Sequence, residues 1–147
     1  MKFLRLIIEM GSKMNYNKTE HMVDRGISKM KIIHCADLHL DSKMNRHLTG
    51  EKRKERKVEL LNSYYRMIRY AKEHDVEVIL IAGDLFDTNV ISKTAGSMVW
   101  NSIKQNPEIC FYYIRGNHDN TGFWEQYGEV PDNLKLFDCN WKYYKIP

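Results

Sequence analysis

Three short polar segments of the chain carry side chains of the kinds that bind metal ions, and each follows a run of apolar residues. The segments span residues 37–39, 83–87 and 116–119. Their carboxylate, imidazole and amide groups make an oxygen-rich donor set with some nitrogen, which suits manganese, iron or zinc better than a thiolate-seeking metal. Two divalent ions about 3.5–4 Å apart can clamp a phosphate and stabilise both the attacking and the leaving oxygen of an in-line displacement. The chemistry that these groups favour is therefore hydrolysis of phosphate esters.

Apolar runs and a helical period predict the elements that position these segments. We expect strands at residues 31–36, 76–82 and 109–114, and helices at 51–74 and 92–104 with Ser92 as the cap of the second. An alternation of strand, helix, strand, helix, strand predicts an α/β fold with a mostly parallel sheet and right-handed crossovers. Because ligands of open α/β sheets bind at the carboxyl ends of the strands, the three polar segments should converge on one site.

The sequence also predicts which helix faces are buried and where further elements lie. The inner face of the first helix is expected to carry Val58, Leu61, Tyr65, Ile68 and Ala71, and that of the second Ala95, Met98, Val99 and Ile103. Apolar runs at 134–137 and 141–146 are candidates for further strands. Residues 1–29 show no strand-like alternation and read as a poorly ordered N-terminal appendage, with Met30 as the expected functional start.

Composition excludes several classes of protein. The chain has 147 residues, of which 43% are hydrophobic and 29% charged, as in an ordinary globular domain. Its three cysteines are an odd number, which predicts neither a disulfide framework nor a thiolate zinc site and favours a reducing cytoplasm. The apolar cluster within the first ten residues is shorter than the roughly 20 residues that a membrane span needs. We therefore expect a soluble cytoplasmic protein with no membrane partner.

The net charge of +4 is concentrated in one stretch of the sequence. Residues 43–57 contain seven lysines and arginines against two glutamates. Such a patch attracts polyanions, although a solvated helix face is the simpler interpretation. Residues 52–57 lie at an expected helix start, where the helix dipole disfavours cations, and this hints at an anionic partner.

Together, the three segments read DxH, GDxxD and GNHD, and they resemble the motifs of the calcineurin-like metallophosphoesterase superfamily. Residues 34–42 and 82–88 are similar, more narrowly, to its DNA-repair exonuclease branch of the SbcD type. The resemblance covers residues 30–147. It implies that these residues form a metallophosphoesterase domain, which corresponds to the front, N-terminal half of the family's sandwich fold. It also implies that the domain hydrolyses DNA phosphodiester bonds with a metal-activated water.

The resemblance also implies the metal ligands. Asp37 and His39 would bind the first of two divalent ions, Asp84 would bridge both, and Asn117 would bind the second through its amide oxygen. Manganese is the expected ion, with iron and zinc as alternatives.

Three further residues have implied roles beside the metal ions. His118 would act as proton donor or charge stabiliser near the leaving oxygen, with Asp119 orienting its ring. Asp87 matches the second motif and is expected behind the direct ligands.

The match to the family is incomplete, which leaves alternatives open. Family members continue with a further histidine and a Gly-His-x-His motif, whereas this chain has no histidine after His118. We therefore expect weak metal binding and slow catalysis unless a second chain completes the site; an SbcC-type ATPase subunit and DNA are the other expected partners. The alternatives are a phosphoesterase acting on small nucleotides or phosphoproteins, and a truncated, catalytically incomplete binding subunit.

Overall fold

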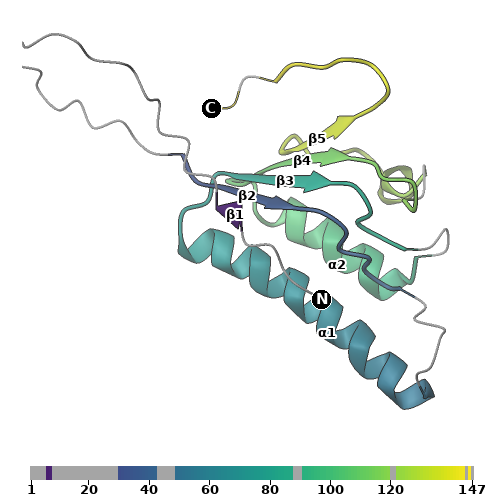
Figure 1. Cartoon of the computed structure of the whole chain (residues 1–147). Coiled ribbons are helices and arrows are strands. Elements are labelled where there is room, and N and C mark those ends of the chain that lie inside the picture. Colours follow the sequence, from purple (N-terminus) through teal and green to yellow (C-terminus); the bar gives the residue numbers. More distant parts are fainter. Residues whose placement is uncertain are drawn as a thin grey trace, which may run out of the picture.

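The structure is a computed structural model that describes residues 6–7, 30–42, 49–87, 91–119, 122–144 and 146. A sheet and two long helices form two layers (Figure 1). Most of the expected appendage at residues 1–29 lies outside the described residues, as do Lys43 and Arg46 of the basic stretch. In the described part of the chain, no helix is both long and apolar enough to cross a membrane.

Four parallel strands form most of the sheet, which confirms the expected α/β fold. They are β2 (Ile32–Cys35), β3 (Val78–Ala82), β4 (Cys110–Ile114) and β5 (Leu134–Phe137), and they lie side by side in the order of the sequence. The run at 134–137 is thus the fourth parallel strand. Residues 141–144 and 146, by contrast, are not in a strand, so the strand considered at 141–146 does not form among these residues.

A short fifth strand, β1 (Leu6–Ile7), pairs antiparallel with β2. No strand was expected in the first 29 residues. A two-residue strand is too short to show the alternation from which strands are predicted, so it could not be recognised in the sequence.

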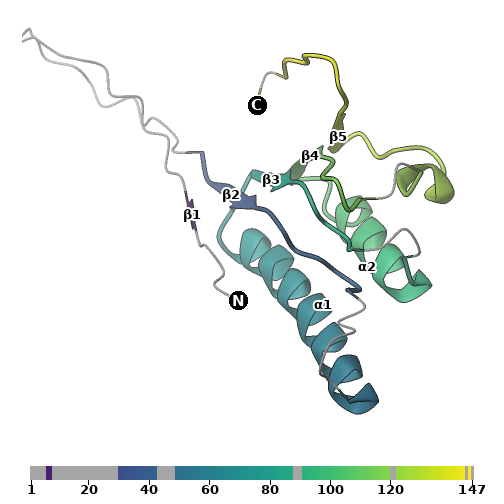
Figure 2. The same cartoon turned by 45° about the vertical axis from the view of Figure 1, so that its right-hand side comes forward.

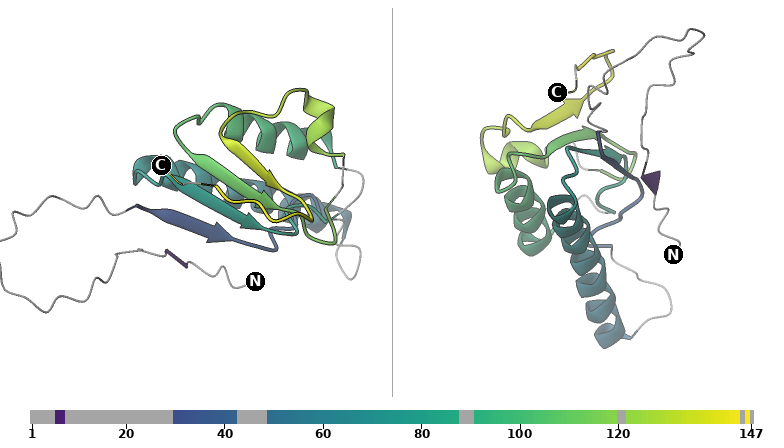
Figure 3. Two further views of the ribbon diagram at one scale, coloured as in Figure 1. Left: turned by 90° about the horizontal axis from the view of Figure 1, so that it is seen from above. Right: turned by 90° about the vertical axis from the view of Figure 1, so that its left-hand side faces the viewer.

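Both helices, α1 (Gly50–Glu73) and α2 (Lys93–Lys104), lie on the same face of the sheet (Figures 1 and 3). Because the parallel strands advance in one direction, right-handed crossovers place every connecting helix on one side. Thr49 and Ser92 cap the helices by accepting hydrogen bonds from the amides of Lys52 and Ala95, at 3.4 and 3.3 Å. The predicted cap at Ser92 is therefore confirmed.

The face of α1 that packs on the sheet differs from the predicted face at two positions. Leu60, Tyr64, Ile68 and Ala71 are buried, whereas Val58 and Tyr65 are 55% and 56% exposed. The Tyr64 hydroxyl lies 2.8 Å from Ser102 Oγ of α2, which satisfies its polar end inside the core. Spacings of three and four fit either face, so hydrophobicity alone did not separate Tyr64 from Tyr65.

The inner face of α2 agrees more closely with the prediction. Ala95, Val99 and Ile103 are fully buried, while Met98 is only partly buried. Trp100 is buried instead, because the 3-10 helix η1 (Trp124–Tyr127) packs against it, with the rings of Trp100 and Tyr127 stacked at 5.2 Å.

The other face of the sheet carries a smaller apolar cluster. Ile32, Val78 and Tyr112 are buried there. The chain after β5 turns back over this face, and Tyr144 packs its ring against those of Tyr112 and Phe137 at 5.7 and 5.2 Å. The central strands are thus covered by helices on one side and by this segment on the other.

The two ends of the parallel strands form two edges of the sheet with different roles. The carboxyl ends of β2, β3 and β4 share one edge, which we call the rim, and each is followed there by one of the three polar segments. The opposite edge carries the exposed turn at His74 and Asp75, between α1 and β3.

Candidate metal centre

The segment after β2 runs beside the segment after β3. The amides of Asp37, His39 and Leu40 donate to the carbonyls of Gly83, Asp84 and Leu85 at 3.2, 2.9 and 2.9 Å. Leu38 and Leu40 are buried in the core, at 8% and 1% exposure. These contacts hold the intervening side chains of Asp37 and His39 at the rim.

This backbone is locally strained. Asp37, His39 and Asp41 have φ angles of 53°, 46° and 62°, and Asp84 has 50°. Residues other than glycine rarely adopt this left-handed region, and they persist in it when the surrounding structure determines the conformation. The hydrogen bonds between the two segments and the buried leucines supply that constraint. The concentration of such residues at one edge is typical of a functional site.

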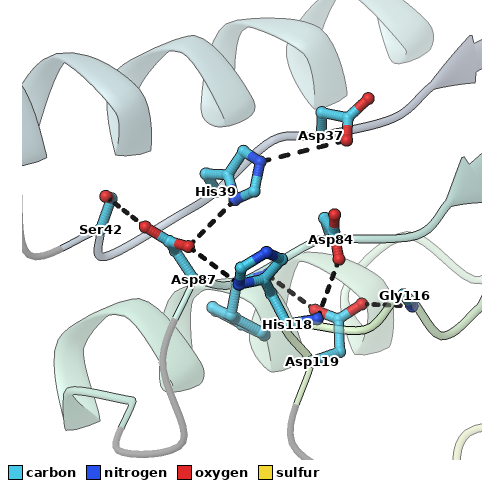
Figure 4. Close-up of polar contacts among 9 residues, drawn as sticks. Asp37, His39, Ser42, Asp84, Asp87, Gly116, His118 and Asp119 are labelled. Atoms are coloured by element: carbon cyan, nitrogen blue, oxygen red, sulfur yellow. Dashed lines mark hydrogen bonds and ion pairs between the residues drawn. The ribbon is translucent and has the colours of Figure 1, made fainter.

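Three of the four predicted metal ligands come together at the rim. Asp37, His39 and Asp84 each offer one ligand atom, and these atoms lie within 4.8 Å of one another (Figure 4). His39 Nε2 is 4.0 Å from Asp37 Oδ1. Two carboxylates and one imidazole are donors that divalent manganese, iron or zinc accept, so these side chains fit such an ion.

Asp87 lies between two imidazole rings. Its Oδ1 is 3.4 Å from Nδ1 of His39 and 3.4 Å from Nδ1 of His118 (Figure 4). The Nδ1 atom of His39 is buried and forms no hydrogen bond of normal geometry within the described residues, and the Asp87 carboxylate faces it. A carboxylate on Nδ1 leaves Nε2 of the ring as the donor to a metal ion, a common arrangement around histidine ligands. The expected position of Asp87 behind the direct ligands agrees with this geometry.

Ser42 fixes the Asp87 carboxylate from the other side. Its hydroxyl donates to Asp87 Oδ2 at 2.6 Å. With Oδ2 held, Oδ1 of Asp87 stays between His39 and His118. The sequence analysis did not assign Ser42 a role, because nothing in the motif shows which loop hydroxyl will face the carboxylate.

The third segment lies against Asp84. The amide of His118 donates to Asp84 Oδ1 at 3.1 Å, which places the backbone of Asn117 one residue from that carboxylate. Asn117 itself is exposed and remains a predicted ligand. The rings of His118 and His39 have centroids 5.6 Å apart in an edge-on arrangement.

Asp119 has a different position from the one expected. It is buried at 7% exposure, and its two oxygens accept hydrogen bonds from the amides of Phe86 at 2.8 Å and Gly116 at 2.9 Å. Asp119 thereby joins the second and third segments, and the contact expected between Asp119 and the ring of His118 is made by Asp87. Burial raises the pKa of the nearby Tyr113 hydroxyl, and the negative charge of Asp119 raises it further.

The two glycines of the site are needed for different physical reasons. Gly83 has a φ of 81°, so it allows a sharp turn at the end of β3. Gly116 has no such angle; a Cβ atom there would collide with the amide and the carboxylate of Asp84. Gly83 therefore serves a turn, whereas Gly116 provides space for Asp84.

Asp41 anchors the first segment to both helices. It is 7% exposed, and its carboxylate accepts hydrogen bonds from Lys57 Nζ at 3.0 Å and from the amide of Ser92 at 2.8 Å. Burial alone would raise the pKa of Asp41, but the hydrogen bonds from Ser92 and Lys57 and the charge of Lys57 hold it below its usual value. Sequence reasoning missed this residue; the only signal was its place two residues after the DxH motif.

A parallel α/β sheet with carboxylates and imidazoles at its rim defines a class of metal-dependent hydrolases, and comparison with known proteins agrees. Residues 30–146 match the family described as Calcineurin-like phosphoesterase, and the chain belongs to this family. The four parallel strands are consistent with part of a metallophosphoesterase fold. Among solved structures, the chain is similar to the nuclease MPE of Pseudomonas putida, with 21% identity and a TM-score of 0.49. That alignment covers 76% of this chain and 50% of the other.

Proposed function

We propose that this chain is a metal-dependent phosphodiesterase that acts on DNA and belongs with the DNA-repair exonucleases of the SbcD type. Membership of the phosphoesterase family supports the reaction class. The observation that carries the proposal is the gathering of Asp37, His39 and Asp84 within 4.8 Å. The similarity of residues 34–42 and 82–88 to the exonuclease branch supports DNA as the substrate.

The residues of the rim can divide the work of hydrolysis between them. Asp37, His39 and Asp84, with Asn117 as the fourth predicted ligand, would hold two divalent ions, which supply Lewis acidity and a nucleophile derived from water. His118 has Nδ1 turned to Asp87, so its Nε2 is the atom that would donate a proton to the leaving oxygen. Asp87 stabilises the protonated ring, and Asp119 holds the loop in place.

Hydrolysis assays with two substrates test the proposal. The full chain with Mn²⁺ should degrade linear DNA and also cleave bis(p-nitrophenyl) phosphate, and Fe²⁺ and Zn²⁺ should be compared at equal concentration. Asp84→Asn should reduce both activities at least a hundredfold, because it removes the carboxylate predicted to bridge the ions. Cleavage of the small diester with DNA left intact would instead favour a phosphoesterase of small nucleotides or phosphoproteins, which would use the same ligands.

A second candidate function is a catalytically incomplete subunit, and the number of ligands favours it. Two ions of this kind commonly take about six ligands each, most of them oxygen. Within the described residues, three acidic or histidine side chains bring their ligand atoms within 4.8 Å of one another. A second chain would then supply the remaining imidazoles, and an ATPase subunit of the SbcC type would be a further partner. Binding of Mn²⁺ without hydrolysis of either substrate would support this candidate.

We also propose a cytoplasmic location. Its three cysteines are free thiols in the structure, as a reducing compartment would keep them.

A further inference from the structure

The first turns of α1 extend past the rest of the molecule. The 24 residues of α1 span about 36 Å, whereas the five residues of β3 or β4 span about 17 Å. Figures 1 and 2 show the start of α1 projecting beyond α2 at the rim end of the sheet. The first buried residue of the helix is Leu60, and none of residues 50–59 is buried. This segment is therefore not held in place by core packing, and the side chains of Lys52, Arg53 and Lys54 are available to a partner.

Three cations of this projecting segment have no counterion in the part of the chain that the structure describes. Within the described residues, Lys52, Arg53 and Lys54 form no ion pair. In the second half of α1, Arg69 and Lys72 lie 3.4 and 3.9 Å from the carboxylates of Glu73 and Glu108, and Arg66 donates to the hydroxyl of Ser63. The projecting turns thus place these three cations at consecutive positions, with Glu51 and Glu55 on the same turns.

These turns are directly connected to the metal centre. Lys57 Nζ is bonded to Asp41 Oδ1 at 3.0 Å, and Asp41 is two residues from His39 in the same rim segment. A chain of phosphates that extends from Asp37, His39 and Asp84 towards Lys57 would reach the first turns of α1 next. A single phosphate or a small diester at the metal ions would not extend to them.

We propose that residues 50–57 of α1, the basic arm, bind the phosphate backbone of a polynucleotide and hold it beside the metal centre. The inference rests on the proposed phosphodiesterase function and deepens it, because the arm would select polymers over small diesters. Lysine and arginine in a first helical turn oppose the helix dipole, and bound phosphates would relieve that repulsion. Single-stranded nucleic acid carries a phosphate every few ångströms, so it can contact several cations of one helix at once.

Charge neutralisation tests the arm. Lys52→Gln, Arg53→Gln and Lys54→Gln are combined in one variant, and glutamine keeps the helix because its helix propensity is close to that of lysine and arginine. Binding of fluorescein-labelled DNA is followed by anisotropy without divalent ions, so that no cleavage intervenes. The dissociation constant should rise at least tenfold at low salt. Each lost phosphate contact lowers the slope of log K against log salt by about 0.7–0.9, so the slope should fall by about 2.

A matched control removes the same charge from the same helix. Arg66→Gln, Arg69→Gln and Lys72→Gln neutralise three cations in the half of α1 that packs on the sheet. This control should change DNA affinity less than twofold. Equal losses in both variants would overturn the proposal, since they would reflect net charge alone, and so would unchanged affinity in the arm variant. Wild-type chain that binds a phosphopeptide but not DNA would overturn it too.

Hydrolysis then separates this proposal from the function on which it rests. The ratio of DNA cleavage to bis(p-nitrophenyl) phosphate cleavage should fall at least tenfold in the arm variant relative to the wild type. A different result is that the wild type cleaves neither substrate while the arm variant, unlike the control variant, loses DNA binding. That result would contradict the proposed hydrolase activity and support the binding role of the arm. An unchanged ratio in an active enzyme would overturn the role of the arm.

Discussion

At the scale of single residues, three carboxylates support the site through contacts with other side chains and with backbone amides. Asp87 contacts two imidazoles, Asp119 joins two loops through backbone amides, and Asp41 joins the first loop to both helices. Such supporting contacts orient metal ligands, and their loss commonly weakens metal binding by about 10–100-fold.

Ser42→Ala tests the support of Asp87. Without the 2.6 Å hydrogen bond, the carboxylate can rotate away from His39, so the affinity for Mn²⁺ measured by titration calorimetry should fall about tenfold. Ser42→Thr keeps the hydroxyl and should recover most of the affinity. An alanine variant that binds Mn²⁺ like the wild type would show that Ser42 has no positioning role.

The cysteines should differ in reactivity. Burial raises the pKa of Cys35 to about 12, and its thiol donates to the carbonyl of Leu80, whereas Cys139 is exposed. The thiolate is the reactive form, so at pH 8 only about one in ten thousand Cys35 thiols can react. Iodoacetamide should therefore modify Cys139 long before Cys35, as peptide mass spectrometry would record. In urea both should react at similar rates; equal rates in the native chain would contradict the burial of Cys35.

At the scale of elements, the sequence predicted the order and approximate limits of helices and strands, and the convergence of Asp37, His39 and Asp84. This succeeded because parallel strands bring their carboxyl ends to one edge whatever the loops do. The partners of Asp119, Asp87 and Ser42 could not be predicted, since they depend on the left-handed backbone of the rim loops. Val58 was placed wrongly on the inner face of α1 for another reason: its turn projects beyond the sheet, so its side chain has no core to face.

Gly116→Ala tests the fit between the loops after β3 and β4. The added methyl group would collide with Asp84, so the loop must shift and Mn²⁺ affinity should fall at least tenfold, with stability lower by about 1–3 kcal/mol. Circular dichroism should still show the native helices.

Gly50→Ala is the matched control, since a Cβ there meets only the end of the Arg53 side chain at 4.0 Å. It should leave metal affinity unchanged and stabilise α1 slightly. Normal Mn²⁺ binding by the Gly116 variant would mean that the two loops are not packed as described.

At the scale of the whole molecule, one amide group connects elements on both sides of the core. Nδ2 of Asn133, just before β5, donates to the carbonyls of Ile103, Asn106 and Ile109 at 2.9, 2.9 and 3.0 Å. It thereby ties the end of α2 and the turn into β4 to the last strand.

Asn133→Ala should lower the free energy of unfolding by about 1–3 kcal/mol, because it leaves partly buried carbonyls without a donor. Urea denaturation followed by tryptophan fluorescence measures the change. Asn101→Ala, at an exposed position on α2, should stay within about 0.5 kcal/mol of the wild type. A similarly small effect at Asn133 would show that water replaces its hydrogen bonds.

The separation of the two sheet edges has a practical consequence. The exposed turn at His74 and Asp75 lies at the far end of the strands from the rim, about 17 Å away by the length of a five-residue strand. A fluorescent dye or an affinity handle attached there would report on the protein, or fix it to a surface, with its loops after β2, β3 and β4 left free for ions and substrate.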